Sequence, residues 1–129
     1  MKGWLIMGGQ FSSPLDFTGK YRGKYDGRNA LLEFWSVFNI FRPGTKYSFG
    51  IKFIDLDRGL TFANNGHQLI QDMAGHFHVI KNFNIPLEGG HGYVNFSRLL
   101  MHTWDTDYIS GESSWNGQEY GMFFVRYHD

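Results

Sequence analysis

Three histidines in the second half of the chain have the spacing of a metal site. His76 and His78 are two residues apart in a segment with strand character, so both side chains point to one face. That His-x-His spacing supplies two ligands for zinc or iron. If the chain turns back at Gly89-Gly90, His102 lies near His76 and adds a third imidazole, although a slip of one residue moves it to the opposite face. We prefer the interpretation that these are ordinary histidines, and we expect no bound cofactor.

Two pairs of carboxylates have a spacing that could also serve chemistry. Asp55 with Asp57, and Asp105 with Asp107, each share one face of a strand. Such pairs could act as general acid and base or bind calcium. The alternative, which we favour, is that these aspartates accept hydrogen bonds from backbone N–H groups in turns at strand ends. The glycines at 89, 90 and 92 lack the lysine and helix of a phosphate-binding loop, and no spacing supports serine catalysis.

Aromatic residues are the strongest compositional signal, at 19% of the chain. Tryptophan and tyrosine have polar ends that need partners when they are buried, so these residues suggest a pocket wall as well as a packed core. We expect the aromatic wall and its polar contacts to come from Tyr21, Arg22, Trp35, Tyr47, Asn82, Arg98, Trp104, Asp105, Tyr108 and Tyr120. Two alternatives stay open, namely that these aromatics fill the core or that they stack on sugar rings.

Composition and charge exclude several classes of protein. The 12 Lys and Arg balance the 12 Asp and Glu, so no overall field attracts nucleic acid or an anionic membrane. The chain contains no cysteine, which excludes disulfides, thiolate zinc sites and a catalytic thiol. Its first residues are apolar over too short a stretch for a signal peptide or a membrane span. We therefore expect a soluble, cytoplasmic protein with no nucleic-acid or membrane partner.

The elements that must position these residues are β-strands. Tyr47, Phe49, Ile51 and Phe53 alternate with polar or small residues, which predicts a strand with one buried face. Tight turns are expected at Asp26-Gly27, at Asp57-Arg58-Gly59, at Asn64-Asn65-Gly66, and at Asn116-Gly117, where the residues favour hairpin geometry. The sequence thus predicts a lead-in over residues 1–16 and one all-β domain over residues 17–129.

The predicted domain is an antiparallel up-and-down barrel of about eight strands. Short connections at regular spacing are typical of sandwiches and barrels. We prefer a closed barrel because an open meander leaves unpaired strand edges.

One segment carries a family resemblance. Thr18-Gly19-Lys20-Tyr21-Arg22-Gly23-Lys24-Tyr25 resembles the first-strand Gly-x-Trp signature of the calycins, the superfamily of lipocalins, avidins and fatty-acid-binding proteins, and nitrobindin-like barrels are similar too. Here tyrosine stands where the family usually has tryptophan. The resemblance implies a barrel in which Tyr21 packs against Arg126 of the last strand and seals the closed end.

The sequence favours a binding function. We expect a small-molecule binding protein that holds a small, partly apolar ligand in the barrel interior. The ligand would enter through the open end of the barrel. The first alternative is a small-barrel isomerase, cyclase or hydrolase that uses the histidine or aspartate groups, and the second is a carbohydrate-binding, lectin-like module. One barrel fold can host all three functions, so fold alone does not separate them.

Overall fold

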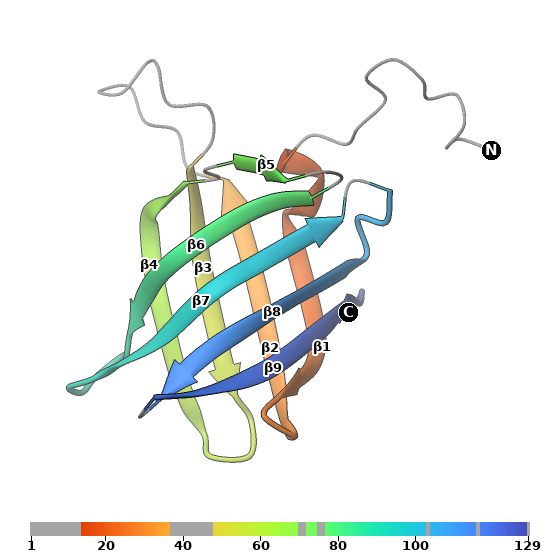
Figure 1. The fold of residues 1–129 in the computed structure, drawn as a ribbon. Coiled ribbons are helices and arrows are strands. Elements are labelled where there is room, and N and C mark those ends of the chain that lie inside the picture. The colour runs from red at the N-terminus through yellow and green to blue at the C-terminus, as the bar shows by residue number, and fades with distance from the viewer. Residues whose placement is uncertain are drawn as a thin grey trace.

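The computed structural model describes residues 14–36, 48–69, 72–74, 77–102, 104–115 and 117–128, and the expected lead-in over residues 1–13 lies outside them. These described residues form a short 3-10 helix and nine strands (Figure 1). These are η1 (Pro14–Phe17), β1 (Gly19–Tyr25), β2 (Arg28–Ser36), β3 (Ser48–Asp55), β4 (Leu60–Leu69), β5 (Asp72–Ala74), β6 (Phe77–Pro86), β7 (Tyr93–His102), β8 (Tyr108–Trp115) and β9 (Gln118–Arg126). Within the described residues, no helix is long and apolar enough to cross a membrane.

The strands form one antiparallel sheet that curls into a nearly closed barrel (Figure 1). Its order is β4-β3-β2-β1-β9-β8-β7-β6-β5, so almost every strand pairs with its neighbour in the sequence. Eight strands build the wall, while the three-residue β5 only extends the edge beside β6. The prediction of an all-β, up-and-down barrel of about eight strands is confirmed.

The pairing of β1 with β9 joins the first strand of the barrel to the last, in the middle of the sheet order. Tyr21 lies opposite Arg126 in this pair, and the guanidinium carbon of Arg126 is 4.8 Å from the centroid of the Tyr21 ring. The expected contact between the first and last strands is therefore present.

A seam between β4 and β6 keeps the barrel from closing along its full length. In the described part of the chain, the backbone contacts across this seam are a bridge between Phe62 of β4 and Leu87, just after β6, and a hydrogen bond of 2.9 Å from the Glu88 N–H to the Thr61 carbonyl. Both contacts lie near the hairpin end of the barrel, as the positions of β4 and β6 in Figure 1 show.

Strand β3 has the predicted alternation. Phe49, Ile51 and Phe53 are buried in the interior, whereas Lys52 lies between them on the partly exposed face. Tyr47, expected on the same buried face, lies outside the described residues.

The predicted turn at Asn64-Asn65-Gly66 is wrong. Strand β4 continues through these residues to Leu69. Phe49 pairs with Gln68 but Ile51 pairs with Asn64, so two steps along β3 correspond to four along β4. The turn-forming residues are accommodated as a β-bulge, which adds length to one strand without reversing it.

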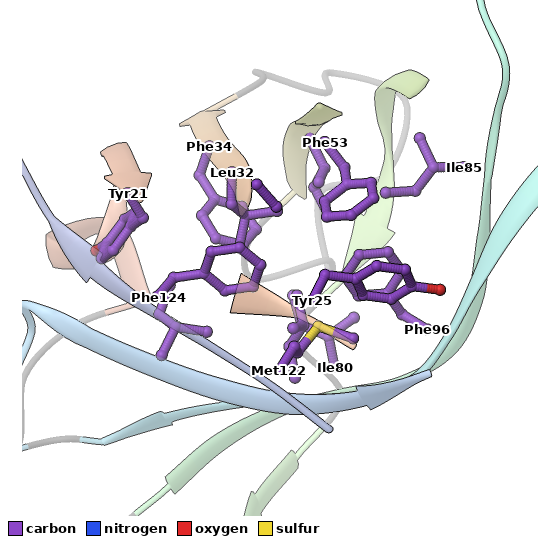
Figure 2. Close-up of a cluster of buried hydrophobic side chains, with 14 of the residues drawn as sticks. Tyr21, Tyr25, Leu32, Phe34, Phe53, Ile80, Ile85, Phe96, Met122 and Phe124 are labelled. Carbon is purple, nitrogen blue, oxygen red and sulfur yellow. The ribbon is translucent and has the colours of Figure 1, made fainter. Parts of the chain in front are cut away.

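The barrel interior is filled by large apolar side chains (Figure 2). Phe53 lies at its centre, where its ring contacts those of Tyr25, Phe96 and Phe124 at centroid distances of 5.0, 5.3 and 6.4 Å. These edge-to-face contacts join both walls of the barrel. Much of the aromatic surplus is therefore core, as one of the two alternatives for these residues expects.

Candidate functional site

The inward-facing residues become polar at one end of the barrel. The hairpins β1–β2, β3–β4, β6–β7 and β8–β9 all turn at this end, opposite η1 (Figure 1). Alternation along β2 places Arg28 on the same face as buried Ala30 and Leu32, and alternation along β3 places Asp55 in line with buried Phe53. We call this end the mouth of the barrel.

A pocket of about 220 Å³ opens at the mouth. Its polar wall includes two arginines, three tyrosines, two serines and one amide, and its apolar part is small. The lining consists of Tyr25, Asp26, Arg28, Arg58, Phe62, Tyr93, Val94, Asn95, Ser113, Ser114 and Tyr120. We call this the mouth pocket.

A buried carboxylate fixes the two arginines of the mouth pocket. Asp55 is only 1% exposed. Its Oδ2 accepts hydrogen bonds from Arg28 Nε at 3.0 Å and from Arg58 Nε at 2.8 Å, and its Oδ1 accepts one from the Arg58 backbone N–H at 3.1 Å. Charge-assisted hydrogen bonds of this kind are stronger than neutral ones. Asp55 therefore ties β2, β3 and the β3–β4 turn together.

These contacts also set the protonation state of Asp55. Burial raises the pKa of its carboxyl, but the hydrogen bonds from Arg58 and Arg28 outweigh burial and hold the pKa below its ordinary value. Both carboxylate oxygens are occupied, and the group stays ionised at neutral pH. Asp55 is thus a positioning residue and is unsuited to act as a general base.

Replacing Asp55 with asparagine should destabilise the protein at neutral pH by about 3 kcal/mol, because two arginines would lose their charged partner. The depressed pKa of Asp55 means that its contribution is present above the pKa of the unfolded chain, about 4, and is lost as pH falls through the lower folded pKa. The acid side of the stability profile should therefore be flatter in Asp55→Asn. Urea unfolding from pH 7 to pH 3 measures this, and parallel profiles for both proteins would contradict it.

The opposite wall of the mouth pocket is a network of hydroxyl groups. The Tyr25 hydroxyl lies 3.0 Å from Ser113 Oγ, which in turn donates to the Asn95 carbonyl. Arg28 lies over the Tyr25 ring, with its guanidinium carbon 5.3 Å from the centroid. Within the described lining there is no histidine or lysine. The arrangement offers hydrogen-bond donors and aromatic faces rather than a nucleophile with an adjacent base.

No known protein family, curated protein or solved structure matches this chain.

Of the predicted pocket residues, Tyr120 alone lines the mouth pocket in the part of the chain that the structure describes. Tyr21 is buried at the other end, where its hydroxyl lies within hydrogen-bond distance of the Phe17 and Thr106 carbonyls and accepts a hydrogen bond from Arg126. Burial raises the pKa of the Tyr21 hydroxyl and Arg126 lowers it by less, so the group remains a protonated donor.

The prediction that Trp104 lies inside a strand as an inward wall group is wrong. Strand β7 ends at His102, and Trp104 is 69% exposed in the following turn. Asp105 lies beside it in the same turn, where its carboxylate accepts a hydrogen bond of 3.0 Å from the Asp107 N–H. This backbone contact is the turn role that we favoured for this aspartate pair.

Three further predicted wall residues belong to the outside of the barrel. The Arg22 guanidinium lies over the Tyr127 ring at 4.5 Å. Tyr108 contacts the His102 ring at 5.4 Å and precedes inward-facing Ile109. Trp35 packs over Gly50, where any larger residue would meet the indole. Successive side chains of a strand point to opposite faces. Because the neighbours of Arg22, Tyr108 and Trp35 are buried inside the barrel, these three side chains point outward.

Asn82 and Arg98 do come together, but on the outer wall. They lie in a shallow groove of about 530 Å³ over β6 to β9, which Lys81, Glu112 and Glu119 also line. Arg98 forms an ion pair of 3.1 Å with Glu112 across β7 and β8. These two residues are therefore surface groups rather than polar contacts inside a barrel.

The three-histidine metal site is not formed by the histidines that the structure describes. His102 pairs with Phe77, one residue away from the expected His76, which itself lies outside the described residues. His78 is buried in the interior beside Phe17, whereas His102 lies on the other face because Met101 is buried. The single-residue difference in register separates the two imidazoles. Among described residues, no group of three metal-ligating side chains comes together.

The arginines of the mouth pocket are what the sequence interpretation missed. Tyr25 pairs with Arg28 across the two-residue turn Asp26-Gly27, whose positive φ angles of 51° and 77° suit a hairpin. That register puts Arg28 in phase with the apolar residues of β2. An arginine at an inward position of an amphipathic strand was the available signal.

Proposed function

We propose that this protein binds a small, partly apolar molecule in the mouth pocket. The observation that carries the proposal is the change of the inward-facing side chains from apolar to polar at the mouth, where a pocket opens above a filled core. Arg28 and Arg58, which Asp55 holds in place, are part of this polar lining. Because the interior is filled, we place the ligand at the mouth and not deep between the walls.

The size of the mouth pocket limits the ligand. Its volume of about 220 Å³ is below the range of roughly 300–1,000 Å³ that is usual for drug-sized ligands. Phe62 and Val94 provide an apolar surface, and three tyrosines provide flat faces. A molecule with one or two rings fits this combination.

We also infer that the barrel is calycin-like. The support for this is the position of η1 before β1, the meander closed by β1 and β9, and the contact of Tyr21 with Arg126 at the closed end. A binding site at the open end agrees with that inference.

NMR titration with 1-naphthamide, a neutral two-ring probe, tests the proposed function. We expect saturable shifts of backbone amides in residues 25–28, 58–62, 93–95 and 113–120, and weaker binding in Tyr120→Ala by several-fold because an aromatic wall is removed. Tyr127→Ala, which removes a tyrosine from the outer face, is the matched control and should bind as the unchanged protein does.

Carbohydrate binding is the second candidate. Tyr93 is 57% exposed at the rim of the mouth pocket, near Asp26 and Asn95, and an exposed ring beside carboxylate and amide groups suits a sugar. The same titration with methyl glycosides distinguishes it. Saturable shifts at the mouth with a glycoside, and none with naphthalene probes, would replace the first proposal with the second.

A further inference from the structure

We propose that the ligand of the mouth pocket is an acid, whose carboxylate is bound by the outer edge of the Arg58 guanidinium. This inference rests on the proposed binding function and names the chemical class of its ligand. The nitrogen atoms of Arg58 differ in their contacts.

One edge of the Arg58 guanidinium is fixed and the other is available. Its Nε and its backbone N–H both donate to Asp55. In the described part of the chain, its two terminal nitrogens have no hydrogen-bond or ion-pair partner, and the side chain is 54% exposed at the pocket wall. A guanidinium held at Nε presents its remaining N–H groups in a planar fork that matches a carboxylate. Asp55 thus prepares Arg58 for an external anion.

Arg28 also donates to Asp55, but fewer of its N–H groups are available to a ligand. Its Nε donates to Asp55, its Nη1 forms an ion pair of 3.4 Å with Asp26, and its side chain is 29% exposed. A ligand carboxylate at the terminal nitrogens of Arg28 competes with Asp26, whereas Asp55 occupies Nε of Arg58 and no acid among the described residues bonds its terminal nitrogens. We therefore assign the main contact to Arg58.

The charges around the mouth pocket nearly cancel, so net charge does not hold the acid there. Arg28 and Arg58 are balanced by Asp55 and by Asp26, and Asp26 is itself part of the lining. No strong local field attracts anions in general, so recognition depends on hydrogen bonds at one site. Phe62, Val94 and the tyrosine rings then contact the apolar part of the acid. A small aromatic carboxylate has both features.

The test compares two probes of nearly the same shape, 1-naphthoate and 1-naphthamide, by calorimetry and NMR titration of the full chain. We expect naphthoate to bind about tenfold more tightly, because both partners are charged in the hydrogen bonds from Arg58 to the carboxylate, whereas only the arginine is charged in those to the amide. Arg58→Gln should remove this preference, so that naphthoate and naphthamide bind the variant with similar affinity. Arg58→Lys, which keeps the charge but loses the planar fork, should retain only part of it. Arg98→Gln, which changes an exposed arginine on the outer wall, is the matched control.

The outcomes separate the two proposals. Equal affinity for both probes, with saturable shifts at the mouth, would overturn the acid preference and leave the proposed function standing. A preference for naphthoate that survives in Arg58→Gln would also overturn it, because the carboxylate would then bind elsewhere. If neither probe binds to folded protein, as judged by circular dichroism, the function of the mouth pocket as a site for small ring compounds fails as well.

Discussion

Replacing Arg126 with alanine is expected to lower the stability of the barrel by about 4 kcal/mol, since several hydrogen bonds and the contact with the buried Tyr21 ring are lost together. The guanidinium donates to the Asp16, Thr18 and Thr106 carbonyls, to the Tyr21 hydroxyl and to the Asp107 carboxylate, at distances between 2.7 and 2.8 Å. It thereby holds η1, the start of β1 and the β7–β8 turn onto the end of β9. Urea unfolding measures the loss of free energy.

The control for this prediction is Arg98→Ala. Arg98 is also paired with a carboxylate across strands, but both side chains are exposed, so its loss should cost less than about 1 kcal/mol. Similar losses of stability in the two variants would mean that the contacts of Arg126 contribute no more than an exposed ion pair does.

Replacing Gly23 with alanine is expected to have an equally large effect. A Cβ at this position would lie 2.7 Å from the Phe124 Cα and closer still to the Phe123 carbonyl oxygen, so a backbone shift would be needed to admit it. Gly23 pairs with Phe124 in the β1–β9 contact, and a shift there disturbs the pairing of the first strand with the last. We expect a loss of about 3 kcal/mol or more, visible as a lower thermal midpoint.

Gly121→Ala provides a comparison within the same pair of elements. Among the described residues, no atom beyond the two chain neighbours lies within 4 Å of a Cβ built at Gly121. Alanine should therefore be neutral, or stabilise the protein by about 0.5 kcal/mol because it restricts the unfolded chain. If both alanine variants unfold at the same temperature, close approach of β1 and β9 at Gly23 is not a requirement of the fold.

Much of the fold could be predicted because period-2 patterns and turn residues act locally. The alternation around Phe49 and Phe53 identified a buried strand face, and Asp26-Gly27 identified a hairpin. The pairing of Tyr21 with Arg126 followed from a resemblance of the first strand to a known superfamily. The Asn64-Asn65-Gly66 segment was misinterpreted because residues that suit a turn also suit a bulge.

The candidate site was harder to predict because it depends on register and on strand ends. Tryptophan is a residue type that often lines pockets, yet β7 ends two residues before Trp104 and the side chain is exposed. His102 is displaced from its expected partner by a single residue. Arg28 and Arg58 come together only through Asp55, which belongs to a third segment. Strand ends, register and these ion pairs cannot be inferred from composition.

The joining of β1 to β9 has a consequence for synthesis on the ribosome. Tyr21 and Arg126 are 105 residues apart in sequence, whereas most other strand pairs in the described sheet link chain neighbours through short connections. Hairpins can form as the chain emerges, but one edge of β1 has no partner until β9, made last, has left the exit tunnel. An unpaired edge invites association with other chains. Lys20, Arg22 and Lys24 lie along β1, and charged side chains on an unpaired strand edge oppose such association.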